Sequence, residues 1–207
     1  MTMTVMMRAT PRWTRRRWLG AATALAVGPR QTSAAAHGLL GPVTPPQPLP
    51  DLGLRLHDGR RAGLAALLRG RVTALQLMFT GCSSVCPLQG AVFAAVQERL
   101  AAGDGRTAPG PLQLLSVSID ALGDDARALA AWRQRHGAGP GWLAGVPAVA
   151  DVDRLVDVLR GRISTADRHT AQVFVIDRLG RLAYRCAELA PAPDVVQALL
   201  GVSRQRG

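Results

Sequence analysis

The sequence predicts an α/β domain in which buried parallel strands are joined by a helix and a closing hairpin adds antiparallel strands. Residues 72–79 form a nearly continuous apolar run, which is typical of a strand buried on both faces. Residues 88–102 repeat apolar side chains at helical spacing, and a second apolar run follows at 112–119. Two buried strands joined by one helix require a parallel crossover connection.

Turn and cap signals predict the remaining elements. Asp58-Gly59 is flanked by Leu54-Arg55-Leu56 and Arg61-Ala62-Gly63 and predicts a hairpin over 54–63, and residues 177–180 predict a second hairpin over 173–184. Further helices are expected at 64–68, at 124–135 with Asp124 as the cap, at 152–160 with Asp151 as the cap, and at 194–202. A domain over 51–203 with this order has the pattern of a thioredoxin-like α/β sandwich with an added N-terminal β-hairpin.

The first 36 residues are expected to be an export signal rather than part of the fold. Three Arg at 15–17 precede about ten apolar residues, which are too few to cross a bilayer, and small residues follow at 33–36. The pattern from Thr14 to Leu19 resembles a twin-arginine signal, with the general export route and a basic terminus without export role as alternatives. The protein is therefore expected in the periplasm, and tied to a membrane only through an uncleaved signal.

Residues 37–50 contain five Pro and are expected to form an extended, semi-rigid spacer between the signal and the domain.

The net charge of +11 comes largely from the N-terminal segment. Residues 1–36 hold six Arg and no acidic residue, so the rest of the chain has a net charge of +5. Its Arg residues are scattered among Asp and Glu, whereas nucleic-acid binders gather basic residues on one face or helix. The composition argues against nucleic acid as a partner.

The segment Phe79-Thr80-Gly81-Cys82-Ser83-Ser84-Val85-Cys86-Pro87 carries the strongest chemical signal. It lies where a buried strand is expected to end and a helix to begin, which is the edge at which open α/β sheets build their sites. The N–H groups of a helix N-terminus favour the thiolate form of cysteine. Four residues along a helix span about 6 Å, so the two thiols could form a disulfide or bind one metal ion. We expect Cys82 and Cys86 to be a redox and metal-binding pair, with a static disulfide or two buried thiols as the alternative.

One of the four histidines is expected to complete a metal site. His37 lies in the spacer, His57 precedes a turn and is expected to be exposed, and His136 lies near a helix end. His169 directly precedes the apolar run at 173–176, and in a thioredoxin-like fold the loop before that strand lies beside the cysteine loop. Two soft thiolates and one imidazole suit copper, above all Cu(I), whereas structural zinc normally takes four protein ligands.

At this point the sequence resembles the Sco/SenC family. The matching pieces are the cysteine segment at 79–87, the strand at 114–120 with two Asp after it, and His169-Thr170 leading to Val-Ile-Asp-x-x-Gly at 175–180. The match extends over about residues 48–200. A Cys-x-x-x-Cys-Pro segment with a downstream His before a strand is the specific part of this resemblance.

The resemblance implies copper binding, as Cu(I) or Cu(II), by Cys82, Cys86 and His169. It also implies a role in assembling the dinuclear copper site of a terminal cytochrome c oxidase, by delivering copper, by reducing the target's cysteines, or both. The protein would be a metallochaperone first and a thiol–disulfide reductase second. Its implied partners are a copper-accepting oxidase subunit and a periplasmic thiol reductant or copper donor. Asp120 stands where the family has an acidic residue near the site.

Three other readings use the same cysteines. A metal-independent periplasmic thiol–disulfide oxidoreductase would need only Cys82 and Cys86, although that chemistry usually has two residues rather than three between them. A thiol peroxidase would place Pro where this chain has Phe79. A structural module would hold the pair as a fixed disulfide.

Two further residues carry smaller hypotheses. Cys186 is expected to be a small buried side chain, with a resolving role as the alternative. Signal cleavage after Ala34 would place His37 third in the mature chain, where the terminal amine, two amide nitrogens and the imidazole could chelate Cu(II).

Overall fold

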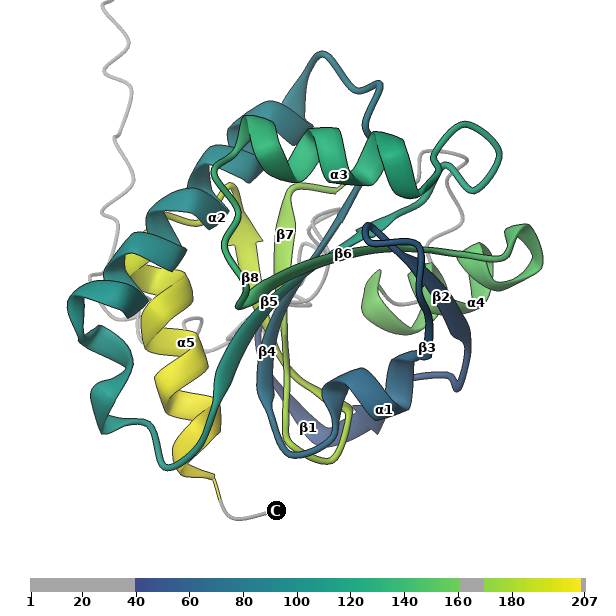
Figure 1. The fold of residues 1–207 in the computed structure, drawn as a ribbon. Helices are drawn as coiled ribbons and strands as arrows, with labels where there is room; N and C mark the ends of the chain where they lie inside the picture. Colours follow the sequence, from purple (N-terminus) through teal and green to yellow (C-terminus); the bar gives the residue numbers. More distant parts are fainter. Residues whose placement is uncertain (1–39, 161–169, 206–207) are drawn as a thin grey trace, which may run out of the picture. The chain divides into compact units, whose positions relative to one another are not determined.

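The computed structural model describes residues 40–160 and 170–205 (Figure 1). The expected export signal, His37 and His169 lie outside these ranges. Within them, no helix is both long enough and apolar enough to cross a membrane.

The strands of the described residues form one eight-stranded mixed sheet, in the order β1-β8-β7-β4-β5-β6-β2-β3. The strands are β1 Gly41–Pro48, β2 Gly53–Leu56, β3 Arg61–Gly63, β4 Val72–Met78, β5 Leu112–Ser118, β6 Trp142–Pro147, β7 Gln172–Ile176 and β8 Arg181–Glu188. The helices are α1 Leu64–Leu68, α2 Val85–Ala102, α3 Ala126–Arg135, α4 Val149–Arg160 and α5 Ala192–Arg204, with a 3-10 turn at Asp104–Thr107.

The centre of the sheet is parallel, as predicted. β4 pairs with β5 and β5 pairs with β6 in parallel, while β7 lies antiparallel to β4 on the other side. Both predicted hairpins are present, β2–β3 at one margin of the sheet and β7–β8 next to β4. Because β4, β5 and β6 run in the same direction, the loops that follow them leave the sheet at one edge.

Helices cover both faces of the sheet (Figure 1). Alternate residues of β4 divide between the faces: Ala74 and Met78 belong to the core under α2, α3 and α5, and Leu75 and Leu77 belong to the core under α1 and α4. A central strand buried on both faces accounts for the uninterrupted apolar run in the sequence.

A polar contact interrupts the larger core. Gln76 in the middle of β4 donates from Nε2 to the Ser116 hydroxyl at 2.7 Å, and the Trp142 indole N–H donates to the same oxygen at 2.9 Å. All three side chains are fully buried. Since an unsatisfied buried donor costs free energy, this shared acceptor joins β4, β5 and β6 in one register.

Two strands differ from the sequence expectation. Residues 41–48 of the expected spacer form β1, an edge strand antiparallel to β8, and edge strands tolerate Pro because one side needs no N–H donors. β6 was not predicted, because its Gly and Pro residues weaken the strand pattern in the sequence. Its pairing with β5 and β2 overrides this weak local preference.

The helix starts also differ. α2 begins at Val85, three residues before the expected start, because Pro87 fits within a first helical turn. α4 begins at Val149, so Asp151 lies in its first turn rather than at its cap. The prediction that Asp124 caps α3 was wrong: Asp125 is the N-cap and accepts the Ala128 N–H at 2.8 Å.

The shared acceptor under the sheet gives a stability prediction. Ser116→Ala leaves two buried donors without a partner and should lower the free energy of unfolding by about 2–4 kcal/mol. Ser203→Ala removes another buried hydroxyl, but this one bonds only its own helix and should cost less than about 1 kcal/mol. Urea unfolding followed by tryptophan fluorescence measures both, and equal losses would contradict the role of Ser116.

Candidate functional site

The cysteine segment connects the carboxyl end of β4 to the first turn of α2. Residues 79–84 form the loop, within which the Cys82 N–H donates to the Phe79 carbonyl at 3.2 Å. Cys86 is the second residue of α2. The structure therefore brings both predicted cysteines to a helix N-terminus at the edge where the parallel strands end.

The two thiols have different environments. Cys82 is half-buried, and its Sγ accepts the Cys86 N–H at 3.5 Å. Burial raises the pKa of Cys82, but hydrogen bonds from the Cys86 thiol and from the N–H groups of Cys86, Ser84 and Val85 outweigh it, so this pKa is lowered overall. Cys86 is only 3% exposed, and burial together with its hydrogen bond to Cys82 raises its pKa to about 12. Cys82 is thus the accessible nucleophile, and Cys86 is held beside it as a thiol.

Asp124 fixes the start of the cysteine loop. Its carboxylate is 4% exposed and accepts three hydrogen bonds, from the Thr80 N–H at 2.9 Å, the Thr80 hydroxyl at 2.5 Å and the Ser118 hydroxyl at 2.6 Å. Ser118 ends β5, so Asp124 joins the ends of β4 and β5. Sequence reasoning missed this role, although two consecutive Asp before one helix were a signal, since only one of them can cap it.

A hollow of about 380 Å³ opens beside Cys82. It is lined by Thr80, Cys82, Pro87, Trp132, Arg135 and His136. The His136 ring packs on Trp132, with the ring centroids 4.6 Å apart. On its other side the ring lies over Gly90 of α2, where a Cβ would come within 2.4 Å of the imidazole. Gly90 therefore allows the end of α3 to approach α2 and hold an imidazole in the same hollow as Cys82.

The other two candidate histidines differ in where they lie. His57 is half-buried rather than exposed, and its Nδ1 lies 3.3 Å from the Ala144 carbonyl on β6. His169 lies outside the described residues. Within the described ranges, no three His, Cys, Asp or Glu side chains converge as a metal site. The thiol pair alone thus represents the predicted ligand set in the described part of the chain.

The described chain resumes beside the cysteine helix. Gln89 is buried on α2, and its Nε2 donates to the Gln172 carbonyl at 3.0 Å. The Glu188 carboxylate of β8 accepts from the Thr170 hydroxyl at 2.9 Å and from the Ala171 N–H. These contacts fix Thr170, the residue after His169, at the same edge of the sheet as Cys86. Neither Gln89 nor Glu188 was singled out from the sequence.

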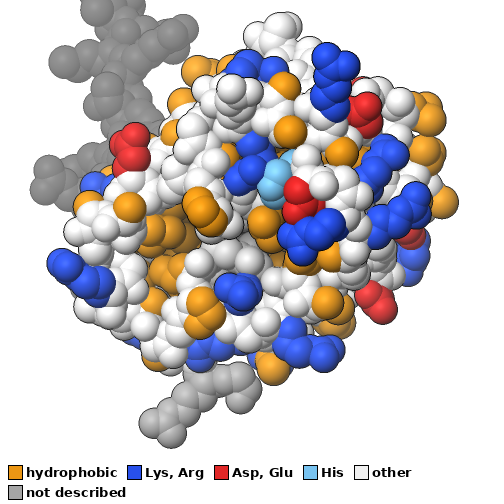
Figure 2. All heavy atoms as spheres, in the orientation of Figure 1, with side chains coloured by type: hydrophobic (Ala, Val, Ile, Leu, Met, Phe, Trp, Pro, Cys, Tyr) orange, Lys and Arg blue, Asp and Glu red, His pale blue; other side chains and the backbone are white. Residues whose placement is uncertain are grey.

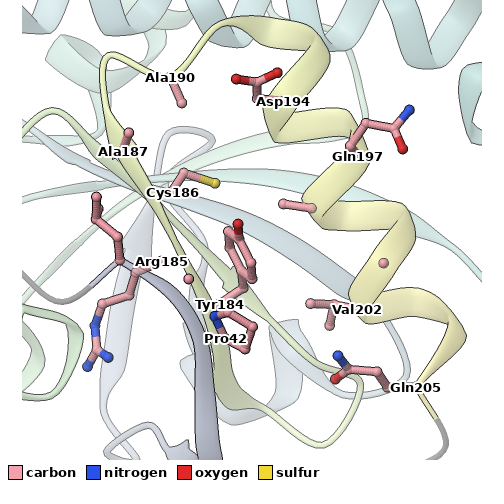
Figure 3. A pocket seen from close by; sticks show the side chains of 14 residues that line it. Pro42, Tyr184, Arg185, Cys186, Ala187, Ala190, Asp194, Gln197, Val202 and Gln205 are labelled. Carbon is pink, nitrogen blue, oxygen red and sulfur yellow. The ribbon is translucent and has the colours of Figure 1, made fainter.

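Cys186 lies on β8, which β7 separates from β4 in the sheet. It is 4% exposed on β8, and burial followed by the nearby Asp194 carboxylate raises its pKa to about 12. Figure 3 shows its sulfur directed toward α5, at a pocket of about 540 Å³ between that helix and the β1–β8 edge. The structure agrees with the expected small buried side chain.

Asp120 has a local role among the described residues. Its Oδ1 accepts the Gly123 N–H at 2.8 Å, which closes the turn after β5. No hydrogen bond from Asp120 reaches the described part of the cysteine loop; Asp124 makes that link instead.

Charged side chains form no single basic surface on the face drawn in Figure 2. Arg side chains are interspersed there with acidic, apolar and neutral ones.

The contrast between the thiols gives a reactivity prediction. In the reduced protein near about pH 7.5, iodoacetamide should modify Cys82 at least about tenfold faster than Cys86 or Cys186, because only Cys82 is both accessible and of lowered pKa. Peptide mass mapping over time measures the three rates. Faster modification of Cys86 or Cys186 would contradict the assignment of the nucleophile.

Asp124 gives a stability prediction with a matched control. Asp124→Ala removes the acceptor of three hydrogen bonds and should lower the free energy of unfolding by about 2–4 kcal/mol. Asp120→Ala removes an acceptor of one backbone N–H and should cost less than about 1 kcal/mol. Urea unfolding compares the two, and a mild effect of Asp124→Ala would show that the loop is held by other contacts.

Comparison with solved structures confirms the thioredoxin-like α/β fold. The structure of a SCO1/SenC family lipoprotein from Bacillus anthracis is similar with a TM-score of 0.65 and 20% identity, over 79% of this chain and 98% of that one. Yeast Sco1, solved with copper bound, is similar with a TM-score of 0.63 and 15% identity, over 78% and 96%. BsSco, a member of the Sco family of cytochrome c oxidase assembly proteins that has a disulfide switch, gives a TM-score of 0.64 and 15% identity, over 78% and 96%.

Comparison of the sequence with curated proteins found no match. The model of the SCO1/SenC family, in contrast, matches residues 54–203, which include the whole cysteine segment and every strand described above except β1 and the first residue of β2. This match covers well over half of the chain and confirms the resemblance based on the cysteine segment. The chain belongs to the SCO1/SenC family.

Proposed function

We propose that this protein binds one copper ion through Cys82, Cys86 and His169 and serves the assembly of the dinuclear copper site of a terminal oxidase. The observation that carries the proposal is the thiol pair at the N-terminus of α2, with one accessible sulfur of lowered pKa and one buried sulfur beside it. The solved structure of yeast Sco1 contains copper, and BsSco belongs to a family of oxidase assembly proteins, which supports this choice of metal and target.

The chemistry of the thiol pair suits Cu(I). Both cysteines are free thiols, and the Cys86 N–H already contacts the Cys82 sulfur, so two soft donors lie close together. Two thiolates leave Cu(I) able to accept a third ligand. Glu188 holds Thr170 just before β7, and Gln172 at the start of β7 accepts a hydrogen bond from Gln89 of α2, so the residue before Thr170 is a suitable source of an imidazole.

The same pair can reduce a disulfide. The Cys82 thiolate attacks one sulfur of the target disulfide, forming a mixed disulfide and releasing the target's other sulfur as a thiolate. Cys86 then loses its proton and attacks the Cys82 sulfur, which releases the second target thiolate and leaves a Cys82–Cys86 disulfide. The target gains two electrons and the protein loses two, so a thiol reductant must restore the pair before the next cycle.

The compartment and partners belong to the same proposal. In an exported protein the thiol pair would tend to oxidise, so a periplasmic thiol reductant or copper donor must keep it reduced, and an oxidase subunit is the acceptor. One similar protein is a lipoprotein, which supports export with attachment at a membrane surface.

A metal-independent thiol–disulfide oxidoreductase is the competing function. The division into an accessible nucleophile and a buried resolving thiol favours it as much as copper handling, because disulfide exchange needs only these two sulfurs. The two functions differ in their need for His169.

Copper binding separates these functions. The exported protein, reduced and kept free of oxygen, should bind about one Cu(I) per chain, and His169→Ala should weaken binding at least about tenfold through loss of one ligand. His57→Ala is the matched control and should change little, since that imidazole contacts the backbone of β6. Competition with a chromophoric Cu(I) chelator measures the affinities. No stoichiometric copper, or equal affinities of the two variants, would favour the metal-independent oxidoreductase.

A further inference from the structure

Large apolar side chains are exposed at a few places on the domain. Those among the described residues are Leu40, Leu88, Leu122, Val149, Leu179 and Leu189. Leu122 is the most exposed of them, at 88%. Single exposed apolar side chains are ordinary, but several on one surface indicate contact with another molecule.

Three of these side chains follow the central strands at the edge that carries the thiols, and Leu189, which follows β8, lies at the same edge beyond β7. Leu122 is in the loop after β5, Val149 begins α4 directly after β6, and Leu88 is near the start of α2 after β4. β4, β5 and β6 are neighbouring parallel strands, so the segments that follow them leave the sheet at the same edge. Leu179 lies in the β7–β8 turn at the opposite edge, and Figure 1 shows this turn far from the loop after β4.

The loop that bears Leu122 borders two hollows, because Asp124 bonds Thr80 of the first and Ala121 lines the second. The first is the hollow beside Cys82, of about 380 Å³. The second, also of about 380 Å³, is lined by residues of β2, β3 and the end of β6, and also by Ala121 and Val149. Leu122 is thus an exposed apolar side chain on a loop that borders both hollows, one of which contains the reactive sulfur, and an extended segment could lie across this loop.

The acidic and basic side chains at this edge differ in the partners that they have within the fold. Asp124 accepts three hydrogen bonds, Asp151 pairs with Arg154 at 2.7 Å, and Asp120 accepts a backbone N–H. In contrast, Arg135 beside Cys82 and Arg55 beside the second hollow contact only backbone carbonyls, each at 3.5 Å, with no ion pair among the described residues. The acidic groups are satisfied within the fold and the guanidinium groups are available to a partner.

We propose that Leu88, Leu122, Val149, Arg55 and Arg135 form a docking face for a cysteine-bearing segment that is apolar and acidic. This rests on the proposed function, because such a segment would belong to the protein that receives copper or electrons from Cys82. The apolar side chains contribute burial next to the reacting sulfurs, and the guanidinium groups contribute attraction to acidic residues. The docking face selects a protein target over a small disulfide.

Disulfide exchange with three probes tests the docking face. The reduced protein, freed of reductant, is mixed with an oxidised Cys-x-x-x-Cys peptide flanked by Leu, Asp and Glu, with the same peptide flanked by Ser and Lys, or with 2-hydroxyethyl disulfide. Loss of probe disulfide gives the rates. Leu122→Ser is compared with Leu179→Ser, the matched control at the opposite edge, after thermal unfolding has shown that both variants fold.

The acidic apolar peptide should react at least about fivefold faster than the basic one, and raising salt from about 50 to about 500 mM should reduce that advantage. Leu122→Ser should slow the reaction with the acidic apolar peptide about threefold to tenfold, and Leu179→Ser should leave it unchanged. With 2-hydroxyethyl disulfide, both variants should match the wild type.

Different failures have different meanings. If the wild type reduces 2-hydroxyethyl disulfide but does not distinguish the peptides, or if the two Leu variants behave alike, the docking face is overturned while the thiol chemistry stands. If the wild type reduces none of the probes, the reductase part of the proposed function fails and the docking face fails with it.

Discussion

The carboxylate of Asp124 connects the cysteine loop to the rest of the fold. It accepts the N–H and the hydroxyl of Thr80, two residues before Cys82, and the hydroxyl of Ser118 at the end of β5. The loop would otherwise follow β4 as a free connection of several residues, and its N–H groups could not point consistently at one sulfur. Because Asp124 is buried, these bonds form away from competing water and hold the loop strongly.

The difference between the two thiols follows from that placement. Fixing Thr80 sets where the chain enters α2, so that the first N–H groups of the helix surround the Cys82 sulfur while Cys86 turns into the core beneath it. One sulfur is then accessible and stabilised as a thiolate, and the other is close but held as a thiol. Such a pair suits both the binding of a soft metal and the resolution of a mixed disulfide. Copper delivery and disulfide reduction are for this reason two uses of one geometry.

The sequence predicts the parallel centre of the sheet well, because β4 and β5 are buried on both faces and therefore apolar throughout. It predicts the cysteine pair for the same reason, since the pair follows directly from the end of a recognisable strand. β1 and β6 escape prediction because their Pro and Gly residues oppose strand formation locally, and only pairing with distant strands stabilises them. The role of Asp124 also depends on a distant partner, Thr80, 44 residues away in the chain, which no local pattern indicates. The expected ligand His169 and the export signal lie outside the described residues and stay predictions.

In the proposed site, two sulfurs of unequal environment and one imidazole hold copper at the N-terminus of α2. X-ray absorption at the copper edge of the Cu(I)-loaded protein counts the sulfur and nitrogen donors around the metal. We expect two sulfur donors and one nitrogen donor, with the nitrogen lost in His169→Ala and both sulfurs kept. Three sulfur donors would mean that a thiol other than Cys82 and Cys86 binds the metal, and a coordination shell unchanged by His169→Ala would remove that imidazole from the site. Either result would overturn the proposed ligand set.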